Sequence, residues 1–209
     1  VGIFMETCPD YVTSCIGALK AGGAVMPLAM ESPDNLLKSI LEEAKPKLVI
    51  TKQRHLSRLG SSLNIQVLLI DTDDTWRDAS EHQPAINSIH DLAFVPYTSG
   101  TTGNPKGVMY THRSTYLHTM AVCMADALAL SSTDCVLGVV PMFHAASWGL
   151  PYAGAMAGIK FVFSAVNDPA VLHDLMLREG VTDSAGVPTV WLAHFRYCDK
   201  EGLDLPPLK

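Results

Sequence analysis

Short apolar runs alternate along the first part of this chain with segments that have helical periodicity. Four of these runs are bounded by turn residues, as buried strands are: residues 2–6, 24–28, 47–51 and 66–70. Helices are expected between them at 11–20, from 33 onwards and near 53–59. Because strands that alternate with helices form βαβ units, the pattern predicts a parallel sheet with helices on its faces.

The helix that follows residue 32 has a good start signal. Ser32 is expected to be its N-cap, and Pro33 is expected to occupy its first helical position. Its apolar residues recur at the spacing of a single helix face: Leu36, Leu37, Ile40 and Leu41. The spacing therefore predicts an amphipathic helix with one buried face.

The alternation resumes after a polar stretch at residues 71–88, which is predicted to be a surface connection. Strands are expected at 92–97, 108–111, 135–140, 159–163 and 181–185. Helices are expected at 113–130, 147–157 and 169–178, and from residue 188 onwards. With no internal repeat and no recognisable linker, the chain is assigned to the α/β class, with layered parallel or mixed sheets and flanking helices.

The chain is short of charge for its length. Of its 209 residues, 15 are basic and 21 acidic, so charged residues make up 17% where about 25% is typical. With 48% hydrophobic residues, intrinsic disorder is excluded, because enough apolar surface can be buried to offset the ordering entropy. The charge deficit predicts that either a membrane or further protein covers part of the chain.

An uncharged segment between Asp134 and Lys160 is long enough to cross a bilayer as a helix. Pro141, Pro151 and four glycines interrupt this segment. Turn and strand signals divide it, so it is predicted to be a buried strand, a turn and a short helix, and no transmembrane segment is expected.

Nucleic acid is not expected as a partner, because phosphate backbones are bound by clustered Lys and Arg, whereas this chain has a net charge of −6. Residues 45–58 carry five positive charges and no acid but lack interleaved aromatics, so this stretch is interpreted as a solvated helix face. The five cysteines show no C-x-x-C spacing, which indicates reduced thiols and a cytoplasmic location.

The stretch from Tyr97 to Gly107 combines glycines, hydroxyls and one lysine in a way that suits a polyphosphate. Glycines let backbone N–H groups converge on an anion, hydroxyls add donors, and Lys106 adds a positive charge. The Walker A and G-x-G-x-x-G spacings are both absent. A strand is expected after the loop, so a hairpin without a helix dipole would hold the phosphates. The alternative is a Gly/Thr-rich surface turn.

This stretch resembles the phosphate-binding signature of the adenylate-forming, or AMP-binding, superfamily. Three further segments resemble motifs of that family in the same order: residues 19–28, 141–149 and 186–191. Tyr110, His112, Arg113 and Ser114, together with Trp148, look most similar to medium- and long-chain fatty acyl-CoA synthetases. The resemblance implies that residues 1–209 are part of the family's large N-terminal domain and that its C-terminal domain is absent.

The same resemblance implies ATP-dependent activation of a fatty acid, first to an acyl-adenylate and then to acyl-CoA. ATP, Mg²⁺ and coenzyme A would take part, and the small-molecule partners would be the fatty acid, ATP and CoA; a homodimer is compatible with this assignment. The family's Mg²⁺-binding glutamate, ribose-binding aspartate and C-terminal lysine have no counterpart here, so the isolated chain is expected to be inactive. Origin in a larger protein also explains the charge deficit.

The resemblance assigns roles within the loop. Thr98 would contact Mg²⁺ or phosphate, and Lys106 would be a catalytic residue that screens the departing pyrophosphate. The residues between them would cradle the phosphates of ATP: Ser99, Gly100, Thr101, Thr102 and Gly103. A solvated loop lysine is the alternative interpretation of Lys106.

Two later motifs would form the acyl-adenylate pocket of such an enzyme. His144 would orient the substrate carboxylate, which needs no general base because it is ionised at neutral pH. Ala145 and Trp148 would line the pocket, and Gly186 and Val187 would form its wall, with the glycine leaving room for the acyl chain. Core packing is the alternative for both His144 and Trp148.

Asp183 departs from the fatty-acid branch, where a hydroxyl or an apolar residue is expected near this position. Peptide-synthetase adenylation domains carry an aspartate in this region that pairs with a substrate α-amine. Other adenylating enzymes, which act on aryl, short-chain or amino acids, therefore remain open, as does a non-catalytic nucleotide-binding module.

Overall fold

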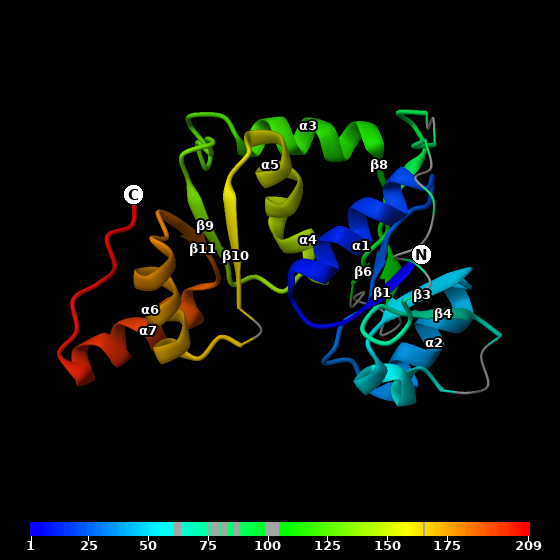
Figure 1. The fold of residues 1–209 in the computed structure, drawn as a ribbon, viewed down its shortest axis with the longest axis horizontal. Helices are drawn as coiled ribbons and strands as arrows, with labels where there is room; N and C mark the ends of the chain where they lie inside the picture. The colour runs from blue at the N-terminus through cyan, green and yellow to red at the C-terminus, as the bar shows by residue number, and fades with distance from the viewer. Residues whose placement is uncertain are drawn as a thin grey trace. The chain divides into compact units, whose positions relative to one another are not determined.

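The computed structural model describes most of the chain: residues 1–60, 64–74, 76, 80, 83–85, 88–98, 105–164 and 166–209. It divides into two compact units, Val1–Tyr116 and Leu117–Lys209. The boundary falls inside helix α3 (His112–Val122), so no glycine- or proline-rich linker marks it in the sequence. Figure 1 shows the elements of each unit.

The first unit is built on a four-stranded sheet in which all neighbouring strands are parallel. The strands lie in the order β2 (Met26–Pro27), β1 (Gly2–Phe4), β3 (Leu48–Thr51) and β4 (Gln66–Leu69). Each strand is slightly shorter than the apolar run that predicted it. The predicted parallel sheet is therefore confirmed.

Three helices connect these strands: α1 (Pro9–Lys20), α2 (Asp34–Ala44) and the 3₁₀ helix η1 (Gln53–Leu59). Leu37 and Leu41 of α2 are fully buried in one core cluster with Phe4 and Val49 of the sheet. Burying a side chain of this size contributes roughly 1.5–3 kcal/mol, so this face anchors α2 to the sheet. The predicted apolar face of α2 is confirmed.

The start of α2 differs by one residue from the prediction. Pro33 is the N-cap, because its ψ of 148° is extended while its carbonyl accepts hydrogen bonds from the N–H groups of Leu36 and Leu37. No side-chain cap is present at this N-cap. The Ser32 carbonyl instead accepts a hydrogen bond from the guanidinium of Arg58, which holds the segment before the helix in place.

Two short antiparallel ladders follow the parallel sheet. β5 (Leu92–Phe94) pairs with β8 (Tyr110–Thr111), and β6 (Tyr97–Thr98) pairs with β7 (Lys106–Gly107). The strands predicted at 92–97 and 108–111 are thus present in shorter form.

The helix predicted over 113–130 is too long. α3 ends at Val122, and the N–H of Leu128 turns back to the Val122 carbonyl. Ala129 then has a left-handed φ of 50°, which no continuing α-helix contains.

The second unit has a three-stranded parallel sheet with β9 (Cys135–Gly138) in the middle. Its outer strands are β10 (Lys160–Phe163) and β11 (Asp183–Ala185). Three helices accompany this sheet: α5 (Leu150–Ala157), α6 (Pro169–Glu179) and α7 (Pro188–Glu201). These strands and helices were all predicted, within a few residues at each end.

Alternate residues of β9 pack into different core clusters. Leu137 lies in a cluster with Leu172 of α6, whereas Val136 lies in a second cluster with Leu150 of α5. A strand that is buried on both faces reads as a continuous apolar run, which is why the segment around β9 carries no polar alternation.

The uncharged segment between Asp134 and Lys160 forms β9, a tight turn and α5, as its prolines and glycines predicted. Within the described residues, no helix combines the length and the apolar character that crossing a membrane requires.

Candidate functional site

In the first unit, the candidate phosphate loop is closed by a hairpin. Thr98 is the register partner of Lys106, and Tyr97 is the partner of Gly107, across the antiparallel β6–β7 ladder. The N–H of Val108 extends the ladder with a 2.9 Å hydrogen bond to the Pro96 carbonyl. The element after the loop is a strand, so the predicted hairpin is confirmed.

The two loop residues that the structure describes are open to solvent. Thr98 and Lys106 are both exposed, and neither side chain forms a hydrogen bond or an ion pair with another described residue. The predicted phosphate-binding residues between them lie outside the described residues: Ser99, Gly100, Thr101, Thr102 and Gly103. One hydroxyl and one ammonium group therefore stand opposite each other where the loop begins and ends.

In the second unit, the other two motifs meet at one edge of the sheet. Residues 141–149 follow β9, and Gly186 and Val187 follow β11. Because β9 and β11 are parallel neighbours, both segments leave the sheet at its carboxyl edge. Open parallel sheets characteristically bind ligands at this edge.

The segment after His144 is a left-handed turn, which corrects the helix predicted from residue 147. Ala146, Ser147 and Trp148 have φ values of 51°, 51° and 56° within α4 (Ala145–Trp148), and Gly149 follows at 75°. A regular right-handed helix begins only with α5. Left-handed backbone costs an L-residue roughly 1–2 kcal/mol, so the surroundings must hold this turn in place.

Two hydrogen bonds hold this turn in place, one to the strand-end residue Val140 and one from His118 of α3. The buried Ser147 hydroxyl donates a 2.8 Å hydrogen bond to the Val140 carbonyl. His118 Nε2 donates to the Trp148 carbonyl at 3.2 Å. A Cβ on Gly149 would lie 2.7 Å from the His118 ring, so only glycine fits there. Strained backbone of this kind is concentrated at functional sites in proteins, which makes the turn a site candidate.

The turn presents two of the predicted site residues to solvent. His144 is exposed, which excludes the interpretation that it is a core histidine. Trp148 is 38% exposed, so part of its surface is open to solvent. Ala145 begins α4, but its side chain lies outside the described structure.

The packing around Gly186 explains why this position is a glycine, and the explanation differs from the predicted one. A Cβ at this position would lie 2.5 Å from Val139 Cγ2 and 3.4 Å from the Trp191 ring. Trp191 Nε1 also donates a 3.1 Å hydrogen bond to the Gly186 carbonyl. The protein's own side chains fill the space that the sequence interpretation left for an acyl chain, whereas the neighbouring Val187 is exposed.

The family model of the AMP-binding enzymes matches residues 1–209, the whole length of this sequence. The chain belongs to the AMP-binding enzyme family. The predicted superfamily is thereby confirmed.

The relatives of this AMP-binding chain are longer proteins. Over 114 residues, 54% of the chain, it is 52% identical to a long-chain-fatty-acid–CoA ligase of Thermus thermophilus, of which the match covers 21%. Over 206 residues, 97% of the chain, it is 33% identical to zwittermicin A synthase ZmaJ of Bacillus cereus, of which the match covers 38%. The chain thus spans well under half the length of both relatives.

The fold of the AMP-binding chain is also that of a solved structure. The N-terminal domain of FACL13 from Mycobacterium tuberculosis, bound to an inhibitor, superimposes with a TM-score of 0.88 at 24% identity. The alignment covers 100% of this chain and 54% of that one. The predicted α/β fold class is confirmed.

Asp183 in this AMP-binding chain already has partners. The Thr182 hydroxyl donates a 2.6 Å hydrogen bond to Asp183 Oδ2, and Lys209 Nζ lies 3.8 Å from the same oxygen. The carboxylate is half-buried in β11. A substrate amine would have to compete with Lys209 for it.

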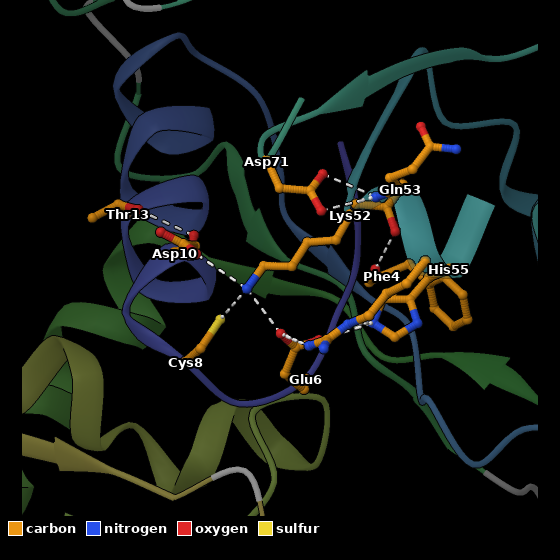
Figure 2. Close-up of polar contacts among 11 residues, drawn as sticks. Phe4, Glu6, Cys8, Asp10, Thr13, Lys52, Gln53, His55 and Asp71 are labelled. Atoms are coloured by element: carbon orange, nitrogen blue, oxygen red, sulfur yellow. Dashed lines mark hydrogen bonds and ion pairs between the residues drawn. The ribbon is translucent and has the colours of Figure 1, made fainter. Parts of the chain in front are cut away.

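Sequence reasoning missed a polar cluster at the carboxyl edge of the first sheet (Figure 2). Lys52 Nζ lies 2.8 Å from Glu6 Oε1 and 3.1 Å from Asp10 Oδ2, and His55 Nε2 lies 2.8 Å from Glu6 Oε2. Arg54 also pairs with Glu6. The prediction that residues 45–58 form a solvated basic face is wrong for Lys52, Arg54 and Arg58, which pair with carboxylates, whereas Lys45 and Lys47 are exposed.

The same cluster shifts the pKa of Glu6. Burial alone would raise this pKa, but hydrogen bonds from Lys52 and His55 outweigh burial and lower it to about 2. A signal was available in the sequence, since Glu6 follows β1 and Lys52 follows β3, and parallel neighbouring strands end at the same edge. These ion pairs and hydrogen bonds join α1 and the segments after β1 and β3, so the cluster stabilises the fold of the first unit.

Proposed function

We propose that this chain carries the ATP-phosphate loop of a fatty acid–CoA ligase, which activates a fatty acid to an acyl-adenylate and then to acyl-CoA. The observation that carries the proposal is the pairing of Thr98 with Lys106 at the two ends of a glycine- and hydroxyl-rich loop, in a chain that matches the AMP-binding family throughout. The 52% identity to the Thermus ligase supports a fatty acid as the substrate class.

The hairpin geometry suits a polyphosphate. The β6–β7 ladder fixes both ends of the loop, so its N–H groups and hydroxyls can surround an anion without helix-dipole assistance. Lys106, which is open to solvent, would neutralise charge on pyrophosphate as it departs. Ser99, Gly100, Thr101, Thr102 and Gly103 remain the proposed phosphate ligands.

The exposed Thr98 hydroxyl fits a role as ligand to Mg²⁺. This cation prefers hard oxygen ligands and is commonly held by few protein oxygens together with substrate phosphates and water. When bound, it would supply charge neutralisation on the phosphates.

The first chemical step would be an attack by the fatty acid carboxylate on the α-phosphorus of ATP. A P–O bond forms to the carboxylate as the bond to pyrophosphate breaks. The exposed His144, beside the strained turn, would orient the carboxylate, which is already ionised at neutral pH. The exposed side chains of Trp148 and Val187 would contact the acyl-adenylate, with Ala145 and Gly186 completing the pocket wall.

In the second step, the thiolate of coenzyme A would attack the acyl carbon. A C–S bond forms and the C–O bond to AMP breaks, which releases AMP. We propose that both steps belong to a larger cytoplasmic enzyme, of which residues 1–209 form part of the N-terminal domain.

A carboxylate panel tests this function in the intact protein. ATP–pyrophosphate exchange is measured with straight-chain acids from acetate to stearate, with benzoate and with amino acids. Medium- or long-chain fatty acids are expected to support exchange. Exchange with none of the acids, despite measurable ATP binding, would favour a non-catalytic nucleotide-binding module.

Amino-acid adenylation is the second candidate. The 33% identity to zwittermicin A synthase ZmaJ extends over 97% of the chain. Asp183 lies near the region where the resemblance to peptide-synthetase adenylation domains implies an amine-binding aspartate. The existing contacts of Asp183 with Thr182 and Lys209 weigh against it. Exchange that depends on an amino acid, and not on fatty acids, would select this candidate.

A further inference from the structure

Three side chains with metal-binding chemistry converge between α6 and α7, apart from the residues of the proposed site. His194 and Cys198 are four residues apart on one face of α7, and His173 reaches them from α6, which lies beside α7 in Figure 1. All three are buried, with exposed fractions of 7% for His173 and 2% for both His194 and Cys198.

The distances among their ligand atoms match those of a metal site. Cys198 Sγ lies 3.6 Å from His173 Nδ1 and 3.7 Å from His194 Nε2. The ligand atoms of the three residues all lie within 4.8 Å of one another. In tetrahedral zinc sites, Zn–S bonds of about 2.3 Å and Zn–N bonds of about 2.1 Å place the sulfur and nitrogen about 3.6 Å apart. One ion could therefore contact all three residues with little backbone movement.

Hydrogen bonding holds this cluster only weakly. The Cys198 S–H can donate to one of the two facing nitrogens, and the other imidazole, as its N–H tautomer, can donate to the sulfur. A thiol is a weak donor and a weak acceptor, so these contacts are weaker than bonds to a metal ion would be.

We propose that His173, His194 and Cys198 bind one thiophilic transition-metal ion, with Zn²⁺ as the ion to test. A thiolate combined with two imidazoles suits borderline-soft cations and disfavours Mg²⁺ or Ca²⁺. The Zn–S bond forms as the thiol proton leaves to solvent, so each zinc bound releases about one proton. The ion would join α6 to α7.

The test is zinc binding by the intact, chelator-treated protein, measured by competition with a chromogenic chelator. One zinc per chain is expected, and Cys198→Ser is expected to weaken its binding by at least about tenfold. Cys135→Ser is the matched control, because Cys135 is also buried in the second unit but its sulfur contacts the Glu179 carbonyl. This control should bind zinc as the unaltered protein does.

Cobalt binding to the unaltered protein provides a second readout, which needs no variant to fold. Co²⁺ added to the unaltered protein should give a thiolate-to-cobalt charge-transfer absorption, which Cys198→Ser removes and Cys135→Ser keeps. Absence of stoichiometric zinc binding in protein that circular dichroism shows to be folded would overturn the proposal and leave a buried thiol–imidazole cluster. Equal zinc affinity in the Cys198→Ser protein would overturn it as well.

Discussion

Thr98 lies directly opposite Lys106 in the antiparallel β6–β7 ladder. A hydroxyl and an ammonium group are thereby held across from each other at the mouth of the loop that joins them. Both side chains are exposed, and neither is engaged by another residue in the described parts of the chain.

Replacing Lys106 by Ala should lower the rate of ATP–pyrophosphate exchange by roughly 100-fold, because the positive charge that we propose to neutralise the leaving phosphates is removed. Thr98→Ala should lower the exchange rate as well, and the reduction should be larger at low Mg²⁺ concentration than at high Mg²⁺ concentration. Lys200→Ala, which removes a lysine exposed on α7, is the control and should leave exchange unchanged. Unaltered exchange in both loop variants would contradict the loop assignment.

Glu6→Gln should reduce the free energy of unfolding by about 2 kcal/mol at neutral pH, because the ionised carboxylate accepts hydrogen bonds from Lys52 and His55. The folded pKa of about 2 lies below the ordinary 4.5, so this stabilisation is present above pH 4.5 and is lost as the pH falls towards 2. Denaturant titrations of both proteins across this window measure the difference.

The Glu6 prediction has a matched comparison in Glu42→Gln. Glu42 forms an exposed pair with Lys38 on α2, so its replacement should cost less than about 0.5 kcal/mol at any pH. If the loss of unfolding free energy in Glu6→Gln stayed constant down to acidic pH, ionisation of Glu6 would not be the source of that loss.

Gly186→Ala should destabilise the protein by about 1–3 kcal/mol, because the added methyl group would meet Val139 Cγ2 at 2.5 Å. Val139→Ala removes the clashing group, so the double variant should be more stable than the sum of the two single changes predicts. Strict additivity in this double-mutant cycle would mean that the two residues do not touch.

Gly149→Ala should destabilise the second unit by more than Gly202→Ala does. Both glycines have positive φ values, 75° and 64°, so each alanine is strained. Only at Gly149 would the new Cβ also strike the His118 ring; at Gly202 it would meet open space. Thermal unfolding followed by tryptophan fluorescence compares the two. His118→Ala should recover part of the Gly149→Ala loss.

Local sequence patterns were sufficient to predict most strands and helices and the hairpin that closes the candidate phosphate loop. Burial periodicity is a local property of the chain. The apolar runs at β1, β3 and β9 therefore predicted strands of parallel sheets, and the single apolar face of α2 predicted a flanking helix. The apolar run at residues 108–111 likewise predicted a strand after the loop, and hence a hairpin.

Other features depended on contacts between segments that lie far apart in the sequence. The left-handed turn at 146–149 is held by the Val140 carbonyl and by His118, and the Glu6 carboxylate is paired by Lys52. Local propensity favours a right-handed helix at residues 146–149 and a solvated side chain for Lys52. Only the tertiary contacts decide otherwise.

The sequence by itself therefore determined the family and the order of the strands and helices, since these follow from motif and periodicity, and it predicts the phosphate-binding chemistry of the loop. The tertiary structure alone decided that Gly186 is packed by Val139 and Trp191, and that His173 meets Cys198 in the interior. The physical reason is that side-chain encounters depend on strand register and helix packing, which bring together residues that no local pattern relates.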